Sequence, residues 1–214
     1  MRVAVIGAET ALGKRLAAEF AARSWFFAAL PSAYAPAAGE LADFDAVVDA
    51  ILPGDGAETH AALLKQLAAV MRALPGVRLI ALGSAGSLYL DESRTRRLCD
   101  LTPEGAGGEK STDSAFAALC DSGADWTCFS PAAEFAADGP RSGRPILGRD
   151  VRILDSAGKS RLSYADCAVA IADELERGSF HGKRFTAVSD CSGCPPAPEN
   201  NLIDLRLKLF TEIL

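Results

Sequence analysis

Two glycines, Gly7 and Gly13, frame the part of the sequence whose residue types are best suited to bind a ligand. An apolar run over 3–6 precedes them and a stretch of alternating character over 14–23 follows, which predicts a buried strand, a tight turn and a helix. Such a turn presents backbone N–H groups and the positive end of the helix dipole to whatever lies above it. The stretch is therefore suited to bind a pyrophosphate.

Thr10 occupies the middle position of this glycine frame. In a dinucleotide fingerprint the first glycine makes the turn, the middle one lets phosphate approach the backbone, and the last lets the helix pack closely on the sheet. Gly7 and Gly13 can fill the two outer roles. Two interpretations remain open, namely a pyrophosphate-binding turn and a strand-to-helix turn that binds nothing.

The elements that must position this turn alternate between strands and helices. This alternation predicts an α/β fold, a Rossmann-like doubly wound parallel sheet in a single domain over 1–190, with a small substrate-side region near its carboxyl end and an extension over 191–214. Residues 34–41 are expected to be a loop or a short helical turn, residues 89–108 an exposed excursion over the site, and residues 141–163 a small hairpin region beyond the main sheet. The strands are expected over 3–6, 25–30, 44–52, 77–82, 125–130 and 184–188, and the helices over 14–23, 58–74, 111–120, 163–176 and 200–214.

Composition narrows the class of protein. With 214 residues and 49% hydrophobic content, the chain can bury a large core without a metal or a disulfide. A net charge of -6 and the lack of an extended Lys/Arg cluster argue against nucleic acid as a partner. No apolar run approaches the roughly 20 residues of a membrane span, and the chain enters a strand at once, so we expect a cytoplasmic protein.

Several other side chains admit two interpretations. Asp49 is either a polar group at the rim near a ligand or an ordinary strand-end carboxylate. We expect His60, in the first turn of a helix, to be solvated or near a cap and not catalytic. Phe135 would cap the site or belong to the core. Cys191 and Cys194 form a C-x-x-C pair, either redox-active or incidental, without further zinc ligands nearby, so we expect no metal site.

Four stretches, taken in their order and spacing, resemble the atypical short-chain dehydrogenase/reductase group with NAD(P)H-binding domains, which includes NADH-flavin reductase-like and NmrA-like proteins. The stretches are Val3–Gly13, Gly83–Leu88, Asp125–Ala133 and Ser163–Glu176, and the resemblance covers residues 1–188. It implies a Rossmann domain that holds NADP or NAD. The cofactor-binding residues that it implies are Gly7, Thr10, Ala11, Leu12, Gly13, Ser32, Ala50, Ile51, Gly83, Ser84, Ser130, Pro131 and Ala132.

The sequence departs from this family at three positions near the cofactor. Glu9 and Thr10 replace a threonine and a glycine, and Ser32 stands where an arginine usually follows the second strand. A carboxylate beside a pyrophosphate would repel it unless it points away. The preference between NADP and NAD therefore stays open.

The Tyr-x-x-x-Lys pair of ordinary short-chain dehydrogenases is missing, because Tyr164 is followed four places later by Ala168. This argues against alcohol or ketone chemistry by that route, and no catalytic residue is assigned. One hypothesis is an NAD(P)H-dependent reductase of a flat acceptor such as a flavin or quinone, which needs little more than two stacked rings. The alternative is a non-catalytic, NmrA-like sensor or partner-binding protein. The residues expected to shape the site are Thr10, Leu12, Ser84, Ser130 and Phe135.

The last predicted helix carries an apolar stripe made of Leu202, Leu205, Leu209 and Ile213. This stripe would dock either on its own domain or on a second subunit, and a homodimer is the testable form of the second alternative. Deleting residues 200–214 should then halve the mass in solution, measured by light scattering. A full-length chain that is already monomeric, or a truncated chain that is still dimeric, would contradict this expectation.

Overall fold

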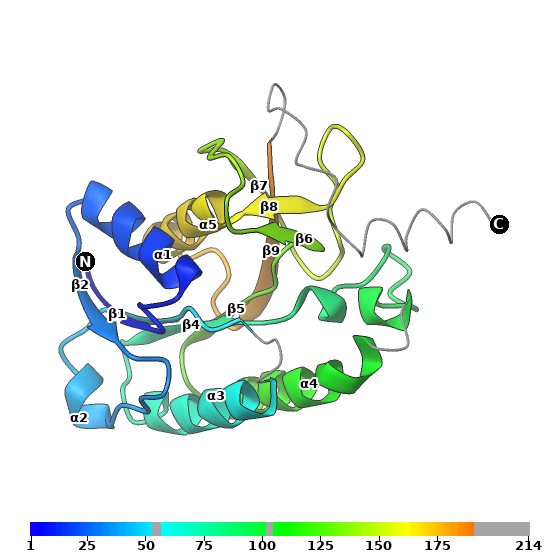
Figure 1. Ribbon diagram of the computed structural model, residues 1–214. Coiled ribbons are helices and arrows are strands. Elements are labelled where there is room, and N and C mark those ends of the chain that lie inside the picture. Colours follow the sequence, from blue (N-terminus) through cyan, green and yellow to red (C-terminus); the bar gives the residue numbers. More distant parts are fainter. Residues whose placement is uncertain (53–56, 102–104, 191–214) are drawn as a thin grey trace.

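A mostly parallel sheet forms the centre of the molecule in the computed structural model, which describes residues 1–52, 57–101 and 105–190 (Figure 1). Among these residues the strand order is β2-β1-β3-β4-β5-β9-β7, and every neighbouring pair is parallel except β7 and β9. This confirms the predicted Rossmann-like architecture. The strands are β1 Arg2–Ile6, β2 Phe26–Leu30, β3 Ala46–Asp49, β4 Arg78–Leu82, β5 Trp126–Phe129, β7 Pro145–Gly148 and β9 Lys183–Ser189.

Helices cover both faces of the sheet (Figure 1). Along β1, Val3 and Val5 pack with α1 and α5 on one face, whereas Ala4 and Ile6 pack with α3 and α4 on the other. Because both faces are buried, the strands are continuously apolar, as parallel strands usually are. The helices are α1 Ala11–Ala22, α2 Ala38–Leu41, α3 Ala57–Met71, α4 Gly105–Asp121 and α5 Tyr164–Arg177, with short 3-10 turns at Ala85–Ser87 and Leu98–Leu101.

The carboxyl-terminal third of the sheet differs from the sequence prediction. The sequence predicts a hairpin region over 141–163 beyond the main sheet; the hairpin is wrong, although Arg161–Ser163 does lie in a separate two-stranded sheet. β7 instead joins the edge of the main sheet, where Ile146 pairs with Val188. β8 (Arg161–Ser163) pairs in parallel with β6 (Glu134–Ala136). β7 and β8 each pair with a strand that is distant in the sequence. Local turn signals carry no information about such pairing.

The fourth helix is longer than its sequence pattern indicates. α4 begins at Gly105, whereas the expected helix begins at residue 111. Glycine is a poor helix former, so a glycine-rich start argued for a loop. α4 packs alongside α3 in the structure (Figure 1), and such tertiary packing routinely overrides intrinsic propensity.

The amino terminus of α5 is held by its own cap and by a neighbouring loop. Ser163 is the N-cap, and its Oγ accepts a hydrogen bond from the Asp166 amide at 3.0 Å, a role for which serine is preferred. The buried Asp166 carboxylate accepts from the Ser142 amide, the Ser142 hydroxyl and the Gly143 amide. It therefore anchors the loop that leads into β7.

A buried ion pair joins the carboxyl end of α5 to the sheet. The Arg78 guanidinium at the start of β4 donates to the Glu174 carboxylate and, at 2.5 Å, to the Thr127 hydroxyl. Glu174 also accepts from the amides of Ser179 and Phe180 at 3.1 and 2.8 Å. One carboxylate thus pairs with a buried cation and also accepts hydrogen bonds from the backbone that follows the helix.

Replacing Glu174 by alanine should lower the free energy of unfolding by about 3–5 kcal/mol, because it leaves the buried Arg78 cation uncompensated. Glu176→Ala is the matched control on the same helix. Its side chain is 49% exposed in an ion pair with Arg23, so the loss should be at most about 1 kcal/mol. Urea denaturation followed by circular dichroism measures both; equal losses would contradict the assigned role of Glu174.

Candidate functional site

The predicted site residues lie along the edge of the sheet where its parallel strands end, which we call the rim. The turn after β1, Ala50 after β3, Gly83 after β4 and Ser130 after β5 follow the carboxyl ends of four adjacent parallel strands. The chain leaves β1 for β2 on one side and returns to β3 on the other. In open α/β sheets, ligands bind outside the carboxyl ends of the strands at such a switch point.

Both glycines of the first turn are required by close packing. Gly7 has a φ of +77°, and a Cβ on it would lie 2.9 Å from Cγ1 of Ile51. A Cβ on Gly13 would lie 2.2 Å from the carbonyl oxygen of Gly7, closer than any side chain could approach. Helix α1 therefore begins directly against the turn.

Thr10 fixes the turn from inside. As the N-cap of α1, its Oγ1 accepts from the Gly13 amide at 2.9 Å and donates to the Ala50 carbonyl at 3.0 Å. The amides of Ala11 and Leu12 stay available to a ligand, because the first turn of a helix offers them no intrahelical acceptor. The Leu12 side chain is in the core, so only its backbone is available at the rim.

The exposed Glu9 carboxylate is bonded toward the second strand. Its Oε1 accepts from the Ser32 amide at 2.8 Å, just beyond the end of β2. Hydrogen bonds from Ser32 lower the pKa of Glu9, which keeps the carboxylate ionised. Glu9 thus lies beside Ser32, and its charge is held at the end of β2.

Asp49 orders the ends of β3 and β4 from beneath the rim. Its fully buried carboxylate accepts from the amides of Ile51 at 3.0 Å and Leu82 at 3.2 Å. The same carboxylate lies 2.7 Å from Nε2 of His60, which is only 5% exposed. The expectation of a solvated or capping His60 is therefore wrong, because the ring is buried as the partner of Asp49.

The remaining small residues support the rim from within. A Cβ on Gly83 would lie 2.9 Å from both Cys128 Sγ and Ser130 Oγ, so this glycine permits close packing of β4 and β5. Ser84 caps the turn Ala85–Ser87 by accepting from the Gly86 amide at 3.0 Å. Ser130, Pro131 and Ala132 are all buried.

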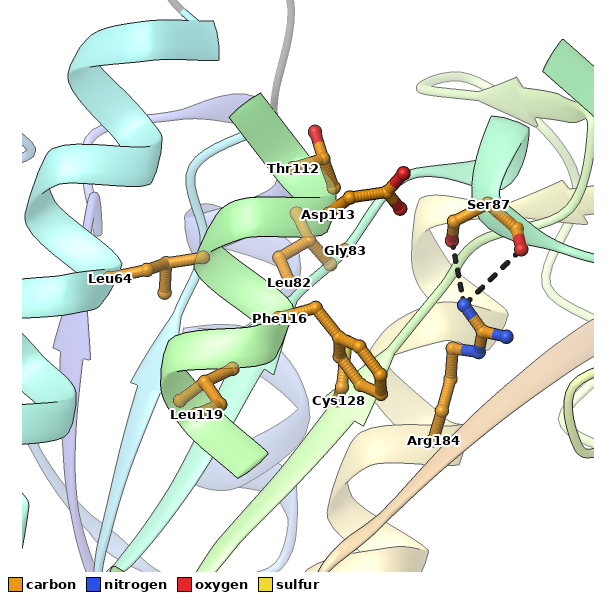
Figure 2. A pocket seen from close by; sticks show the side chains of 10 residues that line it. All are labelled: Leu64, Leu82, Gly83, Ser87, Thr112, Asp113, Phe116, Leu119, Cys128 and Arg184. Carbon is orange, nitrogen blue, oxygen red and sulfur yellow. Dashed lines mark hydrogen bonds between the residues drawn. The ribbon is translucent and has the colours of Figure 1, made fainter. Parts of the chain in front are cut away.

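A small pocket lies below this rim, between α4 and the ends of β4 and β5 (Figure 2). Arg184 reaches up from β9 and donates to the Ser87 carbonyl at 3.2 Å, the Ser87 hydroxyl at 3.1 Å and the Asp150 carboxylate at 3.1 Å. Burial raises the pKa of the Cys128 thiol to about 12, so it stays protonated. The pocket is lined by Leu64, Leu82, Gly83, Ser87, Thr112, Asp113, Phe116, Leu119, Cys128 and Arg184.

Sequence reasoning did not single out Arg184. The signal was present, since Arg184 begins the otherwise mostly apolar run of 184–188. In the structure its guanidinium lies 5.3 Å from the centroid of the Phe116 ring. The strand thus places a cation next to the rim.

Phe135 packs inward. Its ring centroid lies 4.4 Å from that of Tyr164, and it contacts the core cluster that includes α1 and α5. Burial raises the pKa of Tyr164, which therefore stays protonated. Of the two interpretations, the structure favours a core role for Phe135.

Residues 1–52, 57–101 and 105–190 contain neither a membrane-spanning helix nor a cluster of metal ligands. None of the helices there is both long and apolar enough to cross a bilayer. In the same part of the chain, no three His, Cys, Asp or Glu side chains are grouped to hold a metal ion. The pair Cys191 and Cys194 and the expected terminal helix lie outside the described residues.

Comparison with known proteins identifies relatives across most of the chain. No family model matches it. It is 37% identical over 168 residues to the uncharacterized protein YwnB of Bacillus subtilis (strain 168), covering 72% of this chain and 74% of that protein.

Two solved structures share its fold, each with 29% sequence identity. A "putative NADH-flavin reductase" from Streptococcus pneumoniae TIGR4 is 29% identical with a TM-score of 0.79, over 88% of this chain and 99% of the other. A "putative exported protein" from Burkholderia pseudomallei matches over the same shares at 29% identity and a TM-score of 0.76. Together with the glycine turn at the switch point, these matches show that the chain belongs to the NAD(P)-binding atypical short-chain dehydrogenase/reductase family.

Proposed function

We propose that this protein is an NAD(P)H-dependent oxidoreductase that reduces a flat acceptor such as a flavin or quinone. The observation that carries the proposal is the turn from Gly7 to Gly13, which aims the first amides of α1 at the rim of the sheet. The likeness to a protein described as an NADH-flavin reductase supports the reaction class.

The rim fits a dinucleotide. Ala8 and Ala11 are small and at least partly exposed, and the amides of Ala11 and Leu12 would hold the pyrophosphate. Ile51, which is partly exposed, and Ser84 continue the rim along β3 and β4. When bound, the nicotinamide supplies the hydride.

Among the residues that the structure describes, this rim has few groups for proton transfer. The thiol of Cys128 is buried and protonated, and the Asp49–His60 pair lies beneath the surface. The residues would therefore act by holding two rings at reacting distance and excluding water, which suits an acceptor that carries its own reactivity.

A non-catalytic, NmrA-like role is the second candidate. The internal bonding of the Thr10 hydroxyl favours it, because this side chain replaces the glycine that normally admits phosphate. Such a protein would bind a dinucleotide without turnover, or no longer bind one.

We also propose a cytoplasmic location. Cys120, Cys128 and Cys167 carry thiols that form no disulfide, which is usual in a reducing compartment.

Titration with NADH and NADPH by nicotinamide fluorescence, followed by oxidation assays with flavin and quinone, tests the proposal. We expect saturable binding and acceptor-dependent oxidation of the cofactor. Binding without turnover would favour the sensor. No binding at millimolar concentration would overturn the oxidoreductase and leave only the form of the second candidate that has lost its dinucleotide.

Ala11→Glu should weaken dinucleotide binding by about tenfold or more, because it puts a negative charge where the pyrophosphate would lie. The helix itself tolerates an acid in its first turn. Ala18→Glu is the control, since Ala18 is exposed on the same helix but distant from the turn. If fluorescence titration gives equal affinities for the two variants, the assigned phosphate position is wrong.

Iodoacetamide at pH 8 should label Cys120 and leave Cys128 unmodified in the folded protein, because Cys120 is exposed whereas Cys128 is buried with a pKa of about 12. Peptide mass spectrometry follows the two sites, and labelling in urea is the control. Equal rates in the folded protein would instead indicate a reactive thiol in the pocket.

A further inference from the structure

The position of the Glu9 carboxylate indicates which dinucleotide the protein uses. This inference rests on the proposed function. The amides of Gly7 and Ala8 donate to the Leu30 carbonyl at 2.9 and 3.3 Å, so the end of β2 lies against the turn. Glu9 is exposed and accepts from the Ser32 amide at 2.8 Å. A negative charge is thus held at the end of β2.

That place has a defined role in a dinucleotide fold. The adenosine ribose lies at the end of the strand next to β1, where an acidic side chain bonds the 2′-hydroxyl of NAD and an arginine accepts the 2′-phosphate of NADP. Here the acid comes from the turn after β1 instead of from β2. One carboxylate has about four acceptor sites, and the amide and hydroxyl of Ser32 use only part of them.

The sequence around the end of β2 contains no basic residue. No Lys or Arg occurs from Ser24 to Leu64, a segment that contains β2, α2, β3 and the start of α3. The acidic residues within it are Glu40, Asp43, Asp45, Asp49, Asp55 and Glu58. This segment therefore provides no cation to neutralise a phosphate ester at the ribose.

We propose that Glu9 is a specificity-determining residue that selects NADH over NADPH, by accepting a hydrogen bond from the ribose 2′-hydroxyl and repelling a 2′-phosphate. The competing interpretation is that the Glu9–Ser32 bond only fastens the turn to β2. The two differ in their dependence on charge, because a neutral side chain of the same length keeps an acceptor for the Ser32 amide.

Fluorescence titration of the wild-type protein, Glu9→Gln and Glu40→Gln with NADH and NADPH distinguishes the two interpretations. We expect the wild-type protein to bind NADH at least about tenfold more tightly than NADPH, and Glu9→Gln to reduce this ratio to within about threefold. Glu40→Gln is the control, since this exposed carboxylate lies in the same segment but bonds Tyr34 and the Ala37 amide. Its ratio should stay at the wild-type value.

A gain-of-function variant distinguishes a changed cofactor preference from a general loss of dinucleotide binding. Ser32→Arg in the Glu9→Gln background should bind NADPH more tightly than NADH, with thermal unfolding as the check on folding. Equal or stronger NADPH binding by the wild type, or an NADH preference unchanged in Glu9→Gln, would overturn this inference and leave the proposed function intact. Failure of the wild type to bind either dinucleotide would refute the proposed function, and this inference with it.

Discussion

The contact between α1 and the turn after β1 is the constraint on which the site depends. Gly13 lies so close to the Gly7 carbonyl that no side chain fits between them, and this sets where the helix begins. Thr10 then links the same turn to the Ala50 carbonyl, so the ends of β1 and β3 keep one relative position. Because the switch point lies between these two strands, the amides at the start of α1 face the rim of the sheet.

Several polar groups near this rim hold its strands and loops together by hydrogen bonds. Asp49 joins the ends of β3 and β4 and carries His60 as its buried partner, and Arg184 is bonded to Ser87 and Asp150. Buried charges require such partners, since an unpaired one is costly. Because Asp49 and His60 are buried beneath the rim, they do not face a substrate there, which is why the proposed chemistry relies on the cofactor and the acceptor.

The candidate site was predictable where glycine and strand ends defined it, and less so for individual side chains. The family resemblance implied Gly83 and Leu12 as cofactor-binding residues, yet Gly83 makes room for Cys128 and Ser130, and the Leu12 side chain belongs to the core. A sequence pattern shows that a position must be small without showing what lies against it. Glu9 illustrates the same limit, because only the folded chain brings it next to Ser32.

The sequence alone determined the alternation of strands and helices, the turn at Gly7 and the N-cap of α5, since these follow from hydrophobic periodicity and from local hydrogen bonding. Tertiary structure decided the rest. β7 pairs with β9 rather than within a hairpin, α4 begins at Gly105, and His60 is buried against Asp49. Each of these outcomes depends on a partner distant along the chain, and the free energy of such a contact is not encoded in the residues adjacent to it.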